Sequence, residues 1–291
     1  MMALLQVLAI VALAPLVQGA MKRLRANLQG RPGPAPIQPY RDLSKLWKKE
    51  ALLPTGVSAI TRAAPGVSIG VALTFATALP IVSQSHVSAI VDVIALAFLL
   101  GLDRFVLALA ALDTRSAFAG MAASREMAFG SLVEPALLVA LLGGAALSGD
   151  ASLSRLLGLP FGLASALAFA AFFLVMLAET ARIPIDNQET HYELTMIHEG
   201  LVLEYSGWML AILQLAAQIR QLCFLVLASV LLPGGLSLWS HLPWVIAVML
   251  AVTVVETLFA KARLFEVPQL LGSAFILAMT SVGLRLFGVF V

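Results

Sequence analysis

Residues 207–231 read GWMLAILQLAAQIRQLCFLVLASVL, a run of 25 residues with one charged side chain, Arg220. A helix needs about 20 mostly apolar residues to cross a bilayer, whereas a buried strand needs far fewer. The run is continuous rather than alternating, which favours a helix over the strand of a barrel. This stretch alone therefore predicts a membrane-spanning helix.

Seven more stretches of the same kind lie near residues 3–20, 66–84, 88–111, 127–147, 160–178, 243–260 and 268–290. The chain of 291 residues is 60% hydrophobic and 12% charged, whereas soluble domains carry roughly 25% charged residues. Its mean hydropathy is +0.97. We therefore expect one all-α integral membrane domain over 1–291, with about eight transmembrane helices. Its surroundings are the lipid bilayer and other proteins, and we expect no nucleic-acid partner.

The distribution of Lys and Arg gives these spans an orientation. The loop over 21–65 has nine basic residues. Later loops on the same side add Arg115, Arg125, Arg182, Lys261 and Arg263, whereas the opposite loops have only Arg155. Loops rich in Lys and Arg remain in the cytoplasm. The two long loops, 21–65 and 179–206, are therefore expected on the cytoplasmic side of a bacterial or archaeal inner membrane, with both termini outside.

The two long loops carry opposite charge. In the 21–65 loop, nine basic residues stand against Asp42 and Glu50, and residues 40–53 have an amphipathic pattern. Such a helix suits the surface of an anionic bilayer, a docking platform for a soluble partner, or both. The residues expected to contact a partner are Arg31, Arg41, Lys45, Lys48 and Lys49.

The 179–206 loop has six carboxylates and one basic residue, Arg182. A solvated charged loop is the simplest interpretation. However, Glu189, Glu193 and Glu204 would lie on one face if the segment were helical. Like charges arranged in that way persist when some are protonated, paired with a partner, or used in proton transfer.

A metal or cluster site is disfavoured. His191 and His198 are seven residues apart, but the chain has no HExxH motif. Its one cysteine, Cys223, cannot supply the thiolates of structural zinc or of an iron–sulfur cluster. Any carriers of electrons are therefore expected on other chains.

Five ionisable residues fall inside the predicted spans, where charges are costly and usually face the bundle interior or a hydrated cavity: Asp103, Arg104, Glu134, Arg220 and Glu256. Asp103 and Arg104 are adjacent and point to different sides, so we expect their partners on other helices. Glu134 lies roughly 10 Å into its span at 1.5 Å per residue. Glu256 lies near the cytoplasmic end of its span and is expected to reach the interface.

Several segments resemble a known family. AETARIPIDN (178–187), followed by ELT (193–195) and LEYSG (203–207), is similar to the fingerprint loop of respiratory complex I subunit 1. RLRANLQGRPGP (23–34) resembles the first-loop segment of that family. QPYRDLSKLWKKE (38–50) and ELTMIHE (193–199) are closer to its formate hydrogenlyase subunit 4 branch, the homologue found in energy-converting membrane-bound [NiFe]-hydrogenases.

The resemblance implies a non-catalytic membrane anchor that couples a peripheral redox module to ion movement. It implies partners of four kinds: the large and small hydrogenase subunits, an iron–sulfur subunit and antiporter-like membrane subunits. The nickel–iron and iron–sulfur centres would lie on those partners, and this chain would bind no cofactor. The residues that the resemblance and the charge pattern assign to coupling or to the proton path are Glu134, Glu179, Arg182, Asp186, Glu189, Glu193, Glu199, Glu204, Asp103 and Arg104.

Three other functions remain open at this point. A complex I subunit lining a quinone chamber would bind quinone, although His191 and Tyr192 stand where that branch has an acidic residue and a serine. A stand-alone secondary transporter would show an internal repeat, and the two halves show none. A purely structural scaffold would not need a carboxylate such as Glu134 inside the membrane.

Overall fold

The computed structural model describes residues 2–79, 92–145, 153, 162–187, 196–233 and 238–287, and no strand occurs among them. Within these ranges, seven helices are long and apolar enough to cross a membrane. They are α1 (Met2–Leu28), α3 (Ala59–Ala78), α5 (Val93–Asp113), α6 (Ala117–Ala145), α9 (Gly207–Val230), α10 (Leu238–Leu258) and α11 (Val267–Leu286). An eighth apolar helix, α7 (Leu163–Glu179), has 17 residues. Each of the eight predicted spans overlaps one of these helices, so the all-α membrane fold is confirmed.

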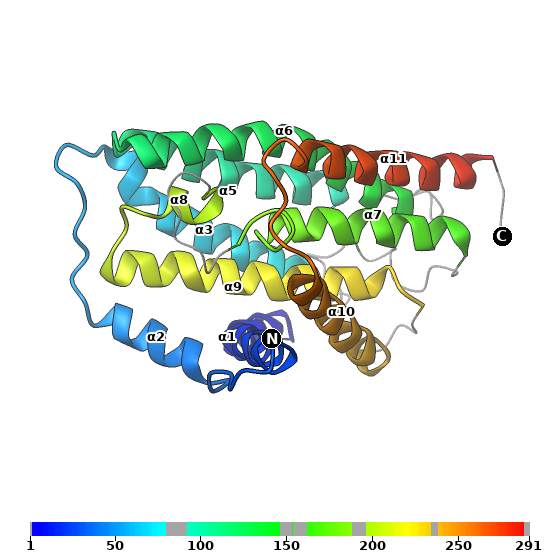
Figure 1. Ribbon diagram of the computed structural model, residues 1–291, viewed down its shortest axis with the longest axis horizontal. Coiled ribbons are helices and arrows are strands. Elements are labelled where there is room, and N and C mark those ends of the chain that lie inside the picture. The colour runs from blue at the N-terminus through cyan, green and yellow to red at the C-terminus, as the bar shows by residue number, and fades with distance from the viewer. Residues whose placement is uncertain are drawn as a thin grey trace.

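The spanning helices form a bundle in which most members run side by side. Figure 1 shows α3, α5, α6, α7, α9 and α11 lying across the view, α1 seen nearly end-on and α10 crossing obliquely. The core contains Phe224 of α9, whose ring lies edge-on to Phe75 of α3 at 5.2 Å between centroids. Phe172 of α7 lies 6.1 Å from the same ring. These aromatic contacts join three helices through apolar packing.

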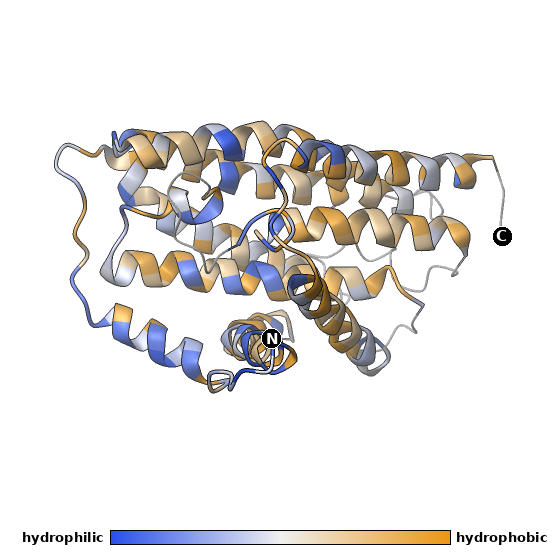
Figure 2. Ribbon diagram, viewed as in Figure 1, coloured by the Kyte–Doolittle hydropathy of each residue, from blue (hydrophilic) through white to orange (hydrophobic). Residues whose placement is uncertain are grey.

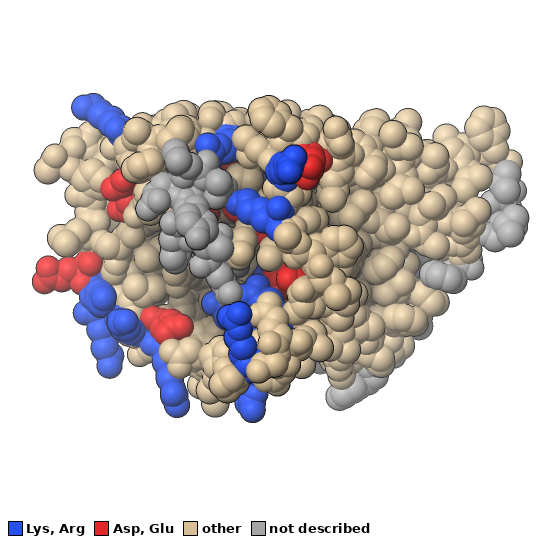
Figure 3. Space-filling view, viewed as in Figure 1, with Lys and Arg blue, Asp and Glu red and all other residues tan. Residues whose placement is uncertain are grey.

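Polar residues gather toward one end of the bundle. Figure 2 shows hydrophilic residues on α2, α8 and the loops beside them, whereas the far end of α7 is hydrophobic. On the face seen in Figure 3, Lys, Arg, Asp and Glu occupy the same half, and the other half shows no charged side chain outside its undescribed atoms. One end of the bundle is therefore suited to water and the rest to lipid.

The first long loop is shorter than predicted. Helix α1 continues to Leu28, and α3 begins at Ala59, so both ends of the predicted 21–65 loop are helical. Between them, α2 (Gln38–Trp47) confirms an amphipathic helix, although it begins two residues earlier and ends six residues earlier than the predicted 40–53 segment. Pro39 lies in its first turn, where the fixed φ of proline suits a helix and no amide donor is needed.

The acidic loop has little helix in its described part. The single short helix there is α8 (His198–Leu201), and Met196 and Ile197 before it are not helical. Glu204 follows the end of α8, so one continuous helix does not carry it together with the earlier carboxylates. Glu189, Glu193 and His191 lie outside the described residues.

Candidate functional site

Arg104 of α5 is shared by three carboxylates inside the bundle. Its Nε lies 3.1 Å from Glu126, and its two terminal nitrogens lie 2.8 Å from Glu134 and 2.6 Å from Glu179. Glu126 and Glu134 belong to α6, and Glu179 is the last residue of α7. The structure thus brings together three residues predicted from the sequence and adds Glu126, which was not predicted as a site residue.

Two glycines make room for this cluster. A Cβ on Gly130 of α6 would lie 2.7 Å from Cδ of Arg104, and one on Gly101 of α5 would lie 3.2 Å from Oε1 of Glu134. The absence of these side chains lets the guanidinium approach α6 closely. The side chain of Glu179 is 7% exposed, whereas that of Glu134 is 43% exposed. The cluster therefore leads from the bundle interior to its outer surface.

Asp103 points away from this cluster, as the sequence predicted for neighbouring helical positions. It is fully buried and forms an ion pair with Arg220 of α9. The structure therefore places both intramembrane residues of α5 against partners on other helices, which confirms that expectation. Asp103 and Arg104 do not share one site.

Arg182 lies in the turn after α7 and is 4% exposed. One terminal nitrogen lies 2.9 Å from Glu256 of α10, and the other donates to the amide oxygens of Gln18 and Gln221. The expectation that Glu256 reaches the interface was wrong, because the residue is 5% exposed and ion-paired within the bundle. A terminal nitrogen of Arg25 lies 3.6 Å from the second carboxylate oxygen of Glu256.

Asp186 connects the same turn to the loop between α10 and α11. Its carboxylate lies 2.7 Å from Nζ of Lys261 and accepts the backbone N–H groups of Asn187 and His198. The N–H of Ala262 donates to the carbonyl of Pro184 at 2.7 Å. Arg182 and Asp186 were both predicted as coupling residues, and each has a separate partner outside the acidic loop.

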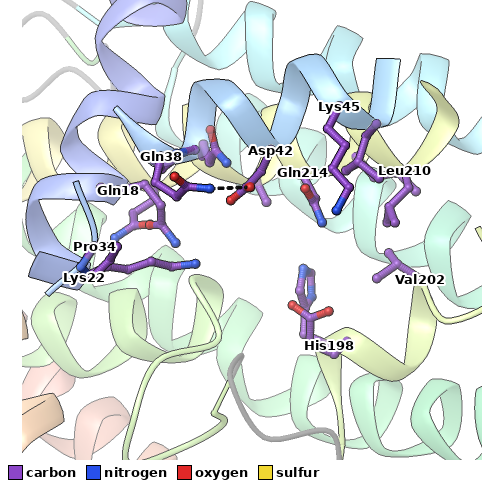
Figure 4. Close-up of a pocket in the computed structure, with 18 of the residues that line it drawn as sticks. Gln18, Lys22, Pro34, Gln38, Asp42, Lys45, His198, Val202, Leu210 and Gln214 are labelled. Carbon is purple, nitrogen blue, oxygen red and sulfur yellow. Dashed lines mark hydrogen bonds between the residues drawn. The ribbon is translucent and has the colours of Figure 1, made fainter. Parts of the chain in front are cut away.

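A polar cavity of about 600 Å³ lies between α1, α2, α8 and α9. Figure 4 shows Lys22 and Lys45 extending into it, with His198 opposite them. Eleven of the twenty described residues that line it are polar or charged. Five of them are glutamines: Gln18, Gln38, Gln214, Gln218 and Gln221. The charged ones are Lys22, Asp42, Lys45, Lys49 and Glu199.

The segment after α8 has an anchoring role. The Tyr205 hydroxyl donates to the carbonyl of Thr61, and burial raises the pKa of this phenol, so it remains a neutral donor. Ser206 bonds both the N–H and the carbonyl of Leu52. Gly207 has φ +56, and a Cβ there would lie 2.3 Å from the carbonyl of Glu50. These residues fix the linker after α2 against α9, while Glu204 is only half-buried.

The basic residues predicted to contact a partner are all exposed: Arg31, Arg41, Lys45, Lys48 and Lys49. Lys45 and Lys49 also line the polar cavity. Lys45 also borders a shallow depression on α2 together with Arg41 and Lys48. No group of three possible metal ligands occurs in the described part of the chain, and Cys223 is buried.

Sequence reasoning missed the partners of Arg182. Gln18 and Gln221 gave no signal, because single amides in apolar helices are common. Lys22 and Lys261 were counted only as basic loop residues. Glu126 lies eight residues before Glu134, which places both near one helical face.

Comparison with known proteins fixes the family. A family model described as NADH dehydrogenase matches residues 1–285. The chain belongs to the NADH dehydrogenase family. It is 33% identical to formate hydrogenlyase subunit 4 of Escherichia coli K12, over 94% of both chains. It is 35% identical to hydrogenase-4 component C of the same organism, over 90% of this chain and 85% of that one.

Two further comparisons find similarity at lower sequence identity to this member of the NADH dehydrogenase family. It is 30% identical to an NADH-quinone oxidoreductase subunit of Cereibacter sphaeroides, over 89% of this chain and 85% of that one. Its fold matches a chain in the structure of the membrane-bound sulfane sulfur reductase, an archaeal respiratory membrane complex, with a TM-score of 0.79. That match covers 96% of this chain and 98% of the other, at 21% identity.

Proposed function

We propose that this chain is the membrane anchor of a multisubunit hydrogenase or formate hydrogenlyase-type complex and couples its redox module to ion translocation. The observation that carries the coupling role is the sharing of Arg104 by Glu126, Glu134 and Glu179. Three ionised carboxylates around one guanidinium leave an excess of two negative charges in apolar surroundings. Repulsion between them favours a shared, movable proton.

The position of this cluster supports the same role. Glu179 ends α7 at the start of the turn that holds Arg182 and Asp186, next to the polar end of the bundle. Glu134 reaches the outer surface of α6, where an antiporter-like membrane subunit would receive the proton. A group that links a polar loop to a lateral membrane surface suits ion transfer between subunits.

The partner surface is the polar end of the bundle. Exposed cations lie on α2, whereas Glu199 and Glu204 lie on and after α8. Surfaces of opposite sign on one end can orient a soluble partner. The large and small hydrogenase subunits and an iron–sulfur subunit would dock there, and they would carry the nickel–iron and iron–sulfur centres. The long loops would then face the cytoplasm of a bacterial or archaeal inner membrane, with both termini outside.

A quinone chamber is the second candidate function, because the 600 Å³ cavity falls in the size range of small-molecule sites. Such sites are lined mainly by apolar and aromatic side chains. Among the described residues that line this cavity, none is Phe, Trp or Tyr, and more than half are polar. The lining fits water or ions better than the ring and tail of a quinone.

The decisive experiment is purification of the complex from its native membrane, followed by subunit identification and metal analysis. We expect a nickel-containing large subunit to copurify, with hydrogen evolution from artificial electron donors and no bound quinone. A complex that lacks nickel and retains quinone would contradict the hydrogenase proposal and support the quinone chamber instead.

A further inference from the structure

Lys22 lines two separate polar voids. One is the cavity of about 600 Å³ described above, between α1, α2, α8 and α9. The other is a void of about 10 Å³, bordered also by Arg25, Arg182, Asp186 and Glu256. A single water needs about this volume, together with two to four polar partners, and the second void supplies both.

An unpartnered donor marks the small void as a water site. Nε of Arg182 is buried and has no hydrogen-bond partner in the described part of the protein, although both terminal nitrogens are bonded. A buried donor without a partner is costly, and ordered water is its usual partner when protein supplies none. Arg182 borders the void together with the carboxylates of Asp186 and Glu256, which accept hydrogen bonds.

Lys22 is the group positioned to move a proton between the two voids. Its side chain extends into the larger cavity (Figure 4), and no hydrogen bond or ion pair of its ammonium group occurs with the described residues. The charged groups facing it come from four parts of the chain: Arg25 on its own helix, Asp42 on α2, Arg182 on the turn and Glu199 on α8. Two of these groups are cations and two are carboxylates.

We propose that Lys22 passes protons from the polar cavity, through one water held by Arg182, to Glu256. This step rests on the proposed function and is separate from the Arg104 cluster, which holds Glu126, Glu134 and Glu179. The ammonium group gives a proton to the bound water, which passes a proton to a carboxylate oxygen of Glu256. Lys22 becomes a neutral amine and takes a new proton from water in the larger cavity. No electron moves, and the net change is one proton transferred from cavity water to Glu256.

Substitutions at Lys22 in the purified complex, reconstituted in sealed vesicles, test the proposal. Lys22→Arg keeps the positive charge but does not release its proton at neutral pH, so ions translocated per electron should fall about tenfold or more. Lys22→His keeps a titratable base whose ordinary pKa is about 6.5, so translocation should persist with its optimum shifted to lower pH. Arg23→Lys is the matched control, because Arg23 is exposed and borders neither void. Wild-type stoichiometry in Lys22→Arg would overturn the proposal.

Cysteine labelling tests water access without relying on translocation. The one native cysteine, Cys223, is buried, so a hydrophilic thiol reagent should not label the wild-type chain. Lys22→Cys should be labelled in the intact complex, and the absence of labelling would overturn the inference. If the wild-type complex translocates no ion at all, the proposed function fails. If it does and Lys22→Arg does too, only this inference fails.

Discussion

Arg182 and Glu256 are 74 residues apart in the chain, yet a guanidinium nitrogen and a carboxylate oxygen lie 2.9 Å apart inside the bundle. The pair joins the turn after α7 to α10, while Gln18 and Gln221 bring α1 and α9 to the same guanidinium. Asp186 and Lys261 add a second link between the turn and the chain after α10. A displacement of this turn by a docked partner would therefore reach three spanning helices directly.

Arg182→Leu should destabilise the assembled complex strongly. Removal of one partner leaves Glu256 buried with only Arg25 at 3.6 Å, and breaking such a pair typically costs about 3–5 kcal/mol. Thermal unfolding of the purified complex in detergent measures the loss. The double variant Arg182→Leu/Glu256→Leu should recover part of the stability, because it leaves no buried carboxylate at position 256 without Arg182. Simple addition of the two single effects would show that the residues are not coupled.

Gly130→Ala should disrupt the Arg104 cluster. The added Cβ would lie 2.7 Å from Cδ of Arg104, so the guanidinium must move away from Glu126 and Glu134. We expect a lower yield of assembled complex and reduced ion translocation per electron. Gly120→Ala on the same helix is the matched control, because a Cβ there meets nothing within 4 Å. It should be neutral or stabilise the helix by up to about 1 kcal/mol. Equal behaviour of the two variants would contradict the steric argument.

The sequence was sufficient to predict the spanning helices but not the ion pairs that form between them. Spans were predictable because lipid imposes a length and an apolar composition on each helix separately. The opposite directions of Asp103 and Arg104 followed from the turn of a single helix. Which carboxylate meets which cation depends on helix packing, so the pairing of Arg104 with Glu134 stayed one possibility among several.

Glu256 shows this limit of prediction from sequence most clearly. Its place near the end of a span predicted contact with the interface, because long polar side chains often reach water from there. The structure buries it instead, because Arg182 enters the bundle from a loop that follows another helix. The polar cavity was also invisible in the sequence, since its glutamines come from three helices and look ordinary separately.

Charge reversal on α2 should release the soluble subunits. Arg41 and Lys45 of α2 and Lys48 just after it are exposed and border one shallow depression. Their replacement by Glu should leave the chain inserted in the membrane and remove the redox subunits from the purified complex, since the encounter surface changes sign. Arg263→Glu, an exposed reversal outside α2, is the control. If the complex stays intact but binds anionic vesicles more weakly, these residues contact lipid rather than the soluble subunits.

Reporter fusions should place the long loops in the cytoplasm. A reporter inserted after Lys49 should be active only as a cytoplasmic reporter, and one fused after Val291 only as an external one. The reason is the excess of Lys and Arg near one end of the spans, which retains those loops on the cytoplasmic side. The opposite pattern of activity would reverse the orientation of the whole bundle.

Glu134→Gln should separate assembly from ion translocation. The amide keeps the size of the side chain and can still accept a hydrogen bond from Arg104, while Glu126 and Glu179 continue to neutralise the guanidinium. We therefore expect normal assembly and normal turnover of the peripheral redox centre with artificial donors. Proton translocation, measured as a pH change outside sealed vesicles, should fall by at least about tenfold, as for loss of a positioned proton-transfer group.

Glu266→Gln is the matched control for this variant, because it makes the same chemical change at an exposed position before α11. It should leave both turnover and translocation unchanged. If Glu134 serves only to hold Arg104 in place, Glu134→Gln should instead lower the yield of complex and leave the ratio of protons to electrons unchanged in the complexes that form. That ratio distinguishes the two roles, because it does not depend on how much complex survives purification.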